Sequence, residues 1–364
     1  MRNWNELIRR HTAFWECGET DRPLVVALYQ AYQDTALVAE AFGQGELLPE
    51  RIDSAPLLPV FDRMAAAHEQ IEDDFIASGE PLLGIPWLEA ICGCRVKIPD
   101  GKSIWAETPA SPIDMDELQI SPDNPWFQSL VNIIQQVVNH AQGRYPISMS
   151  HLRGPTDILA ALMGTNNFLM SLVDEPDRMK RLAVRLAEIY VQVAHAQERL
   201  IPGFYQGYVI RQFGIWSPGR SVWLQDDTSS MISLRRYTQV FLEPMARMSV
   251  FPYGVLHLHA PSLHLAELLA CVRNIRAVNI YFDSPGMSLE KAFPTLKKLQ
   301  EKNVPLILAK DVYQGFALEE YQLIVENLSP RGLSIHMKAG SIDEGREVLA
   351  RVSEWQKRYR RSYP

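Results

Sequence analysis

The sequence predicts an α/β protein built as a (β/α)8 TIM barrel, with a helical extension at the N-terminus and a hairpin insertion. Short apolar runs alternate with helical patterns through the second half of the chain, as in parallel β–α units. The alternative fold is an open, doubly wound sheet. That fold would normally show a Gly-rich phosphate loop after the first strand, and neither a Gly-x-Gly-x-x-Gly motif nor a P-loop occurs.

Length and composition are those of an ordinary globular protein. The chain has 364 residues, of which 47% are hydrophobic and 22% charged. We predict one barrel domain over residues 1–364. The net charge of −7 offers no basic field for nucleic acid or membrane surfaces. Four cysteines are too few for a disulfide scaffold, and no signal peptide or membrane span is evident. We therefore expect a cytoplasmic protein that binds neither nucleic acid nor membranes.

The first half of the chain contains three predicted strands and an insertion. A first strand covers residues 23–29, a weaker one covers 81–85, and a third covers 146–151. Between about 93 and 125 lies a Pro-, Asp- and Gly-rich segment with the hairpin-like sequence VKIPDGKSIWAE. Its Asp100-Gly101 step suits a two-residue turn. We interpret this segment as an insertion in the barrel.

The rest of the chain repeats one unit, an apolar run followed by a helix. The predicted helices cover 156–172, 176–200, 262–271, a segment from about 288, 318–327 and 343–359. The predicted strands cover 207–213, 254–259, 277–282, 305–309 and 332–336. Together with the three earlier strands they make up the eight strands of the barrel.

Titratable side chains follow the C-terminal ends of nearly all predicted strands in the later part of the chain. In such folds the catalytic residues lie at these ends. The candidate catalytic residues are His257, His259, Asp227 and Arg211, and the candidate substrate-binding residues are His151, Arg153, Asp226, Asp283 and Asp311. Trp216 is a further candidate, because an aromatic ring near a strand end can stack on a flat ligand. Packing at the barrel rim is the alternative for Trp216.

His257 and His259 form the most specific pair. Residues i and i+2 of a strand point to the same side, so both imidazoles face the same way and suit a metal ion. His336, at the end of the last predicted strand, would supply a third nitrogen, and Asp283 or Asp311 would supply a carboxylate. A zinc ion with three protein ligands and an open position activates a thiol or water. The alternative is that one histidine makes a core hydrogen bond and the other lies in a loop.

Two further features stand near these strand ends. The adjacent Asp226 and Asp227 lie on an extended segment and point in opposite directions, so only one of them faces the pocket. The segment 154–157 begins a helix directly after a strand, and Thr156 or Asp157 would cap it. The N-terminus of this helix would bind a carboxylate or phosphate, or the segment is simply a loop with a cap.

Three segments in order resemble the uroporphyrinogen decarboxylase superfamily. They are GPTDILAALMGTNNFLMSLVDEPDRMKRLA from Gly154, IWSPGRSVWLQDDTSSMISLRRYTQVFLEPMARM from Ile215, and GVLHLHAPSLHLAELL from Gly254. Family members show a similar Gly-Pro turn with its helix, an Asp-containing segment, and a strand ending in His-x-Cys-Gly or His-x-Asp-Gly. The resemblance implies a (β/α)8 barrel that is often a homodimer.

The resemblance implies two activities. One is cofactor-free decarboxylation of the acetate side chains of uroporphyrinogen, and the other is zinc-dependent methyl transfer between a corrinoid protein and a thiol. The chain departs from both branches. Its first strand, PLVVALYQAYQD, lacks the arginine-rich motif of the decarboxylases. His259 occupies the position of the zinc-binding cysteine of the methyltransferases, and no later cysteine stands near 336–341.

We therefore predict an enzyme for zinc-assisted methyl transfer on a small-molecule substrate, with a corrinoid protein as partner. The alternative is a decarboxylase, a carboxy-lyase of uroporphyrinogen or another multi-carboxylate substrate. Asp227 would then be its pocket carboxylate, and Arg211 or Arg153 would bind the anion. A second alternative is a non-catalytic ligand-binding barrel. Metal content distinguishes the first hypothesis from the other two.

Overall fold

The computed structural model describes the chain except for residues 1, 29–33, 82–83, 112, 284–286, 311–314 and 363–364. Its centre is a seven-stranded sheet in the order β1-β12-β11-β10-β9-β8-β5, and all neighbouring strands are parallel. The strands are β1 (Leu24–Leu28), β5 (Leu152–Arg153), β8 (Ser221–Gln225), β9 (Tyr253–His259), β10 (Ile275–Phe282), β11 (Leu306–Lys310) and β12 (Leu333–Lys338). The α/β fold class is therefore confirmed.

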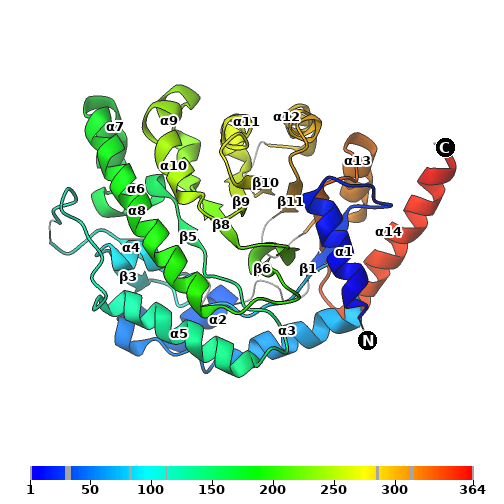
Figure 1. Ribbon diagram of the computed structural model, residues 1–364, viewed down its shortest axis with the longest axis horizontal. Coiled ribbons are helices and arrows are strands. Elements are labelled where there is room, and N and C mark those ends of the chain that lie inside the picture. The colour runs from blue at the N-terminus through cyan, green and yellow to red at the C-terminus, as the bar shows by residue number, and fades with distance from the viewer. Residues whose placement is uncertain are drawn as a thin grey trace.

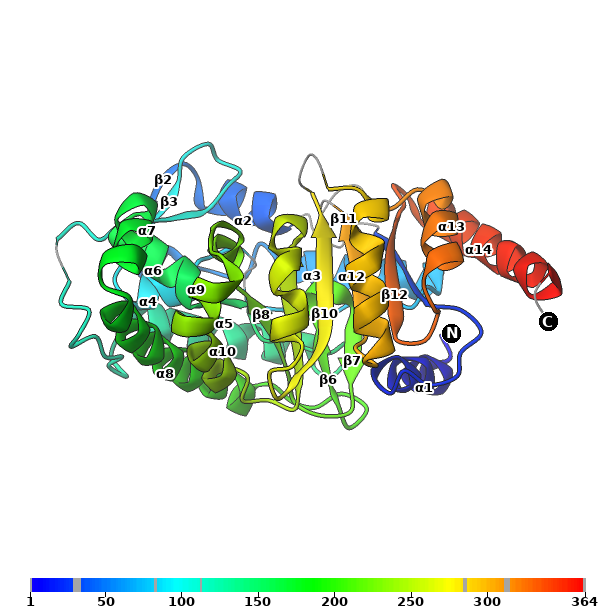
Figure 2. The ribbon, with the colours of Figure 1, turned by 90° about the horizontal axis from the view of Figure 1, so that it is seen from above.

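Helices cover the outer side of this sheet (Figure 1). The helices that precede β5 in the chain are α1 (Trp4–Trp15), α2 (Asp34–Phe42), α3 (Leu58–Ile71), α4 (Trp87–Ile91) and α5 (Pro125–Ala141). They are followed by α6 (Pro155–Met163), α7 (Thr165–Asp174), α8 (Pro176–Leu200), α9 (Leu234–Val240) and α10 (Leu242–Met248). The last are α11 (Ala266–Leu269), α12 (Leu289–Glu301), α13 (Leu318–Asn327) and α14 (Ile342–Ser362). Figure 2 shows α12 and α13 beside β10 and β12.

The last four predicted strands are confirmed as β9 to β12, because their continuous apolar runs are buried on both faces. The strand predicted at 207–213 is present only over its first part, and it does not belong to the main sheet. Residues Tyr208–Ile210 form β6, which pairs antiparallel with β7 (Ile215–Ser217) across a turn at Gly214. Gly214 has a φ of 60°, which glycine adopts without steric cost. The strand of the main sheet is β8, a few residues further along.

The strand predicted at 81–85 includes residues 82–83, which lie outside the described residues. Residues 73–79, a few positions earlier, make the backbone contacts between the two ends of the sheet. On one side, Asp74 N–H donates to Val25 O at 2.9 Å, and on the other Gly79 N–H donates to Pro146 O at 3.0 Å. The carboxylate of Asp74 accepts the N–H of Val25 at 2.7 Å, and that of Asp73 accepts the N–H of Ala27 at 2.8 Å. This segment links edge strand β1 to the chain just before β5. Two carboxylates thus satisfy amides that a neighbouring strand would otherwise satisfy.

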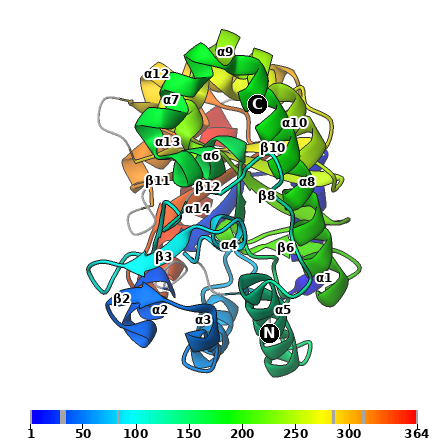
Figure 3. The same cartoon turned by 90° about the vertical axis from the view of Figure 1, so that its left-hand side faces the viewer.

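The predicted hairpin insertion is present, with a longer turn. β3 (Arg95–Ile98) pairs antiparallel with β4 (Trp105–Glu107), and β2 (Gly45–Leu47) extends this small sheet beside α2 (Figure 3). The prediction of a two-residue turn at Asp100-Gly101 is wrong, because β3 ends at Ile98 and β4 begins at Trp105. Asp100 Oδ1 instead accepts the N–H groups of Lys102 and Ser103 at 2.9 and 2.7 Å, which stabilises a longer loop.

The single helix predicted over 156–172 is two helices, α6 and α7. They meet at Gly164, whose φ of 80° interrupts the helical backbone. The strand predicted at 146–151 is also shifted, because the main sheet takes Leu152–Arg153 as β5. None of the helices in the described part of the chain is long and apolar enough to cross a membrane.

The N-terminal helix α1 is attached to the rest of the protein through His11. The His11 imidazole is fully buried; its Nε2 lies 2.9 Å from Asp74 O and its Nδ1 accepts the N–H of Trp216 at 3.1 Å. Both ring nitrogens are therefore satisfied only when the ring is neutral. Burial lowers the pKa of His11 to about 4; the nearby Asp74 raises it, and Arg2 and Arg10 lower it further.

This histidine makes stability depend on pH. Because its pKa is lower in the folded than in the unfolded chain, its contribution is present above about pH 6.5 and is lost as pH falls through about 4. We expect a loss of up to about 3 kcal/mol from this group. In urea unfolding from pH 7 to pH 4, His11→Gln should be less stable than wild type at pH 7 but should lose less stability on acidification. Equal pH slopes for the two proteins would contradict this.

Candidate functional site

The carboxyl ends of β8, β9 and β10 bring the predicted site residues together. These strands are direct neighbours, and their register pairs Gln225 with His257 and His259 with Tyr281. Asp227 lies two residues after the end of β8, and Asp283 directly follows β10. The side chains of three adjacent strand ends therefore meet at one edge of the sheet, where α/β folds place their active sites.

His257, His259 and Asp227 form a cluster suited to a cation. His257 Nε2 lies 3.3 Å from His259 Nε2, which lies 3.3 Å from Asp227 Oδ1. One ligand atom from each of the three residues lies within 4.8 Å of the other two. His257 is buried, whereas the side chains of His259 and Asp227 are partly open to solvent. The cluster is thus accessible from one side.

Both imidazoles are oriented by a partner at Nδ1. Asn279 Nδ2 donates to Ile307 O at 2.9 Å, which turns Asn279 Oδ1 toward His257 Nδ1 at 2.5 Å. An oxygen only accepts here, so His257 carries its proton on Nδ1 and has a lone pair on Nε2. His259 Nδ1 donates to Asp283 Oδ2 at 2.7 Å. This is the arrangement that holds metal-ligating histidines in proteins.

The electrostatics of the cluster favour a positive charge at its centre. Burial lowers the pKa of His259, but its contacts with Asp227 and Asp283 outweigh burial and raise that pKa to about 9. Burial raises the pKa of Asp227, but the two histidines hold it well below its usual range. Burial lowers the pKa of His257, and the charge of Asp227 opposes this shift. The cluster therefore stabilises a cation between two carboxylates.

Asp226 points away from the cluster, as the alternation of an extended chain predicts. Its Oδ1 accepts the N–H of Thr156 at 3.0 Å and the hydroxyl at 2.6 Å, and its Oδ2 accepts the Tyr237 hydroxyl at 2.8 Å. Burial, together with the charge of Asp157, raises the pKa of Asp226 to about 8. The N-terminus of α6 thus binds a carboxylate of its own chain.

The predicted cap at Thr156 or Asp157 is wrong, because Gly154 is the N-cap.

The two candidate arginines are both paired with buried glutamates. Arg211 lies in a single 3₁₀ turn after β6, where its Nη1 contacts Glu80 at 3.1 Å and its Nε donates to Ser78 O at 3.0 Å. Arg153 Nη1 contacts Glu89 at 3.1 Å, and its charge also acts on Asp227. The charge of Arg211 is therefore neutralised inside the protein, whereas Arg153 lies beside the cluster.

Of the remaining predicted site residues, His151 lies near the cluster, whereas Trp216 and His336 lie elsewhere in the fold. The ring of His151 packs on Trp223 at 4.6 Å, close to the cluster. Trp216 lies in β7, where its indole donates to Phe204 O and its backbone contacts α1. His336 is buried on β12 beside Phe213 and is not among the three clustered residues. Burial lowers the pKa of His336 to about 3. Asp311 lies outside the described residues.

Three residues at the site were not predicted. Asn279 orients His257, Gln225 Nε2 donates to Asp227 Oδ2 at 2.5 Å, and Asp157 accepts the backbone N–H groups of Asp227 and Thr228 at 3.0 and 2.7 Å. A signal for Asn279 was present in the sequence. It is a polar residue inside the apolar run AVNIYF, and such a residue needs a buried hydrogen-bond partner.

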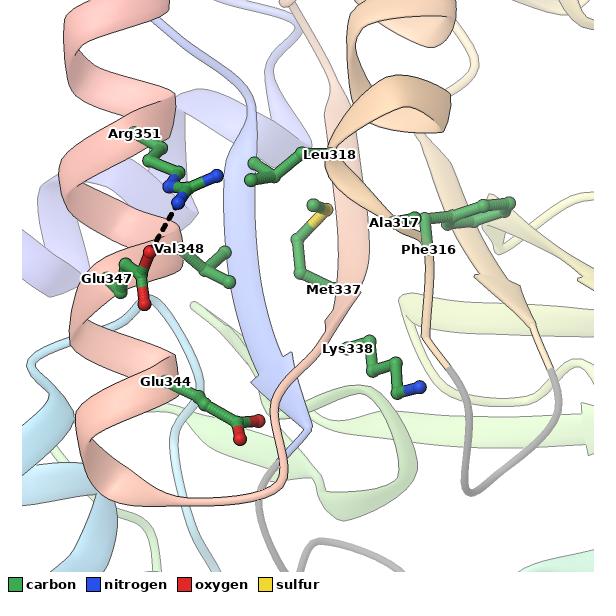
Figure 4. Close-up of a pocket in the computed structure, with 9 residues that line it drawn as sticks. All are labelled: Phe316, Ala317, Leu318, Met337, Lys338, Glu344, Glu347, Val348 and Arg351. Atoms are coloured by element: carbon green, nitrogen blue, oxygen red, sulfur yellow. Dashed lines mark ion pairs between the residues drawn. The ribbon is translucent and has the colours of Figure 1, made fainter.

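A separate hollow of about 230 Å³ lies between α13, β12 and α14 (Figure 4). Apolar side chains such as Leu318, Met337 and Val348 line its floor, and the ion pair of Glu347 with Arg351 lies at its side. No residue of the histidine cluster lines this hollow. It is therefore distinct from the candidate site.

Part of the chain matches the model of a known protein family. Residues 84–199 match the model of the family described as uroporphyrinogen decarboxylase (URO-D). This chain resembles the uroporphyrinogen decarboxylase superfamily. The matched range includes the segment from Gly154 that carried the predicted resemblance and ends before the two later segments. The predicted resemblance to the superfamily is thus confirmed.

A solved structure supports the same fold. A methyltransferase from Methanosarcina mazei superposes with a TM-score of 0.63 and covers 96% of this chain and 98% of its own. The two sequences are 12% identical, so the likeness shows a common fold. No curated protein matches the sequence of this chain.

Proposed function

We propose that this chain is an enzyme that catalyses metal-assisted methyl transfer, with zinc held by His257, His259 and Asp227. The observation that carries the proposal is the convergence of two imidazole nitrogens and one carboxylate oxygen within 4.8 Å at the ends of neighbouring strands. The superfamily resemblance and the fold shared with a methyltransferase from Methanosarcina mazei point in the same direction.

The chemistry of these side chains fits zinc. Two histidines and one carboxylate are a ligand set of catalytic zinc sites, which keep one coordination position open. A cluster that stabilises a positive charge on His259 between Asp227 and Asp283 also fits a divalent cation. When bound, zinc acts as a Lewis acid that lowers the pKa of a thiol or water.

The other residues of the site orient these groups and pack against them. Asn279 and Asp283 hold the two imidazoles by their Nδ1 atoms, so that both Nε2 atoms point into the cluster. The ring of Tyr281 packs at 5.3 Å from the ring of His257 and 5.7 Å from that of His259. The ring centroid of Trp223 lies 5.6 Å from that of His257. The methyl donor in this proposal is a corrinoid carried by a partner protein or a small methylated molecule.

The charges at the site favour methyl transfer over decarboxylation of a multi-carboxylate substrate. Such a substrate needs cations that are free to pair with its carboxylates. Arg211 and Arg153 are each paired with a glutamate, and Asp227 and Asp283 stand at the opening of the cluster.

Elemental analysis of protein purified without chelator tests the proposal. We expect about one zinc per chain in wild type, and its loss in His257→Ala. His195→Ala is the matched control, because His195 lies on α8 with 44% of its side chain exposed, and it should keep the metal. Transfer of the methyl group from methylcobalamin to a small thiol is then followed by the cobalamin absorbance. Wild-type protein that takes up no zinc, even when zinc is added, would refute the proposal.

A further inference from the structure

A second set of polar atoms lies beside the histidine cluster and lacks partners. Within the described part of the chain, Trp223 Nε1, Gln225 Oε1, Arg153 Nε and His151 Nδ1 are buried and make no hydrogen bond. The residues His151, Trp223 and Gln225 are each only 9% exposed. Proteins satisfy the great majority of buried polar groups, so four such atoms in one place indicate that a bound molecule completes the site.

These four atoms belong to β8 and to the neighbouring segment formed by β5 and the residue just before it. Strand β5 pairs with β8 so that Arg153 stands opposite Gln225, and residues two apart on a strand share a face. The ring of His151 packs on Trp223 at 4.6 Å, and the ring of Trp223 lies 5.6 Å from that of His257. Gln225 also donates to Asp227. The unpartnered atoms are therefore continuous with the proposed metal site.

The donor and acceptor pattern defines what can bind there. The indole N–H of Trp223 and the Nε–H of Arg153 can only donate. Gln225 gives its amide N–H to Asp227, so its free Oε1 can only accept. The missing group must therefore present both an acceptor oxygen and an N–H or O–H donor.

Charged groups do not meet this requirement. A carboxylate has no donor for Gln225 Oε1, and Asp227 and Asp157 lie close by. An alkylammonium has no acceptor for Trp223 and Arg153. We infer that residues His151, Arg153, Trp223 and Gln225 form a substrate subsite for an uncharged hydroxyl or carboxamide group. The inference rests on the proposed function only in assigning this group to the substrate of methyl transfer.

Titration of the indole N–H signals in protein labelled with ¹⁵N-tryptophan tests the subsite. The signal of Trp223 is the one missing from Trp223→Phe, and the exposed Trp105 serves as internal control. The probes are propionamide, 1-propanol, propionate and propylammonium, which are similar in size. We expect the two neutral probes to shift the Trp223 signal and to bind at least about tenfold more tightly than the two ions. A shift with only one neutral probe identifies which of the two groups the subsite prefers.

A second variant tests the acceptor. Gln225→Leu removes Oε1 and should weaken propionamide binding about fivefold, the effect of one neutral hydrogen bond. Equal or tighter binding of propionate, or no Trp223 shift with either neutral probe, would overturn the inference. Zinc content is measured on the same samples. Probe binding in protein that takes up no zinc would support the subsite while refuting the proposed metal site, so the two failures are distinguishable.

Discussion

Replacing Asp74 with alanine is expected to reduce the free energy of unfolding by about 3–5 kcal/mol, the cost of leaving buried charges without a partner. The carboxylate of Asp74 is nearly inaccessible and forms ion pairs with Arg10 and Arg22. Burial raises the pKa of Asp74, but these two guanidinium groups hold it well below its usual range. The same carboxylate accepts the N–H of Val25 on edge strand β1. Its removal therefore takes from Arg22 its carboxylate contact, leaves Arg10 with only the exposed Asp21 as an acidic partner, and leaves a strand amide unsatisfied.

Urea unfolding at pH 7 measures this effect, with Asp21→Ala as the matched control. Asp21 also contacts Arg10, at 3.4 Å, but its side chain is 61% exposed. A surface ion pair of this kind contributes little, so the control should lose less than about 1 kcal/mol. Similar losses in the two variants would show that Asp74 does not join α1 and β1 in the way described.

Replacing Asp283 with alanine is expected to weaken zinc binding about 10- to 100-fold. Asp283 does not belong to the three-residue cluster, but it accepts the Nδ1–H of His259 at 2.7 Å. Without this acceptor the imidazole is free to rotate and its Nε2 becomes less basic. Because the side chain of Asp283 is 29% exposed, the free energy of unfolding without metal should change by less than about 1 kcal/mol.

Competition with a chromophoric zinc chelator measures the affinity. Asp283→Asn is the conservative variant, because its amide oxygen still accepts the Nδ1–H of His259, and it should lose less affinity than the alanine variant. A positioning role predicts this partial rescue. If both variants bind zinc as tightly as wild type, Asp283 does not position His259.

The pattern of apolar and polar residues was sufficient to predict the parts of the fold and site that depend on local geometry. The last four strands were predicted within a few residues, and the bounds of α8 and α13 agree with the prediction. The common orientation of His257 and His259 and the opposed orientation of Asp226 and Asp227 follow from the period of two in an extended chain. Such features require no knowledge of which strands are neighbours.

Only the tertiary structure decided which distant residues meet. His336 was predicted as the third ligand, but β12 is separated from β9 by two strands, whereas Asp227 follows β8, the direct neighbour of β9. The pairing of Arg211 with Glu80 and the link made by residues 73–79 also join parts of the chain far apart in sequence. Strand order and register determine these contacts, and no local pattern of residues encodes them.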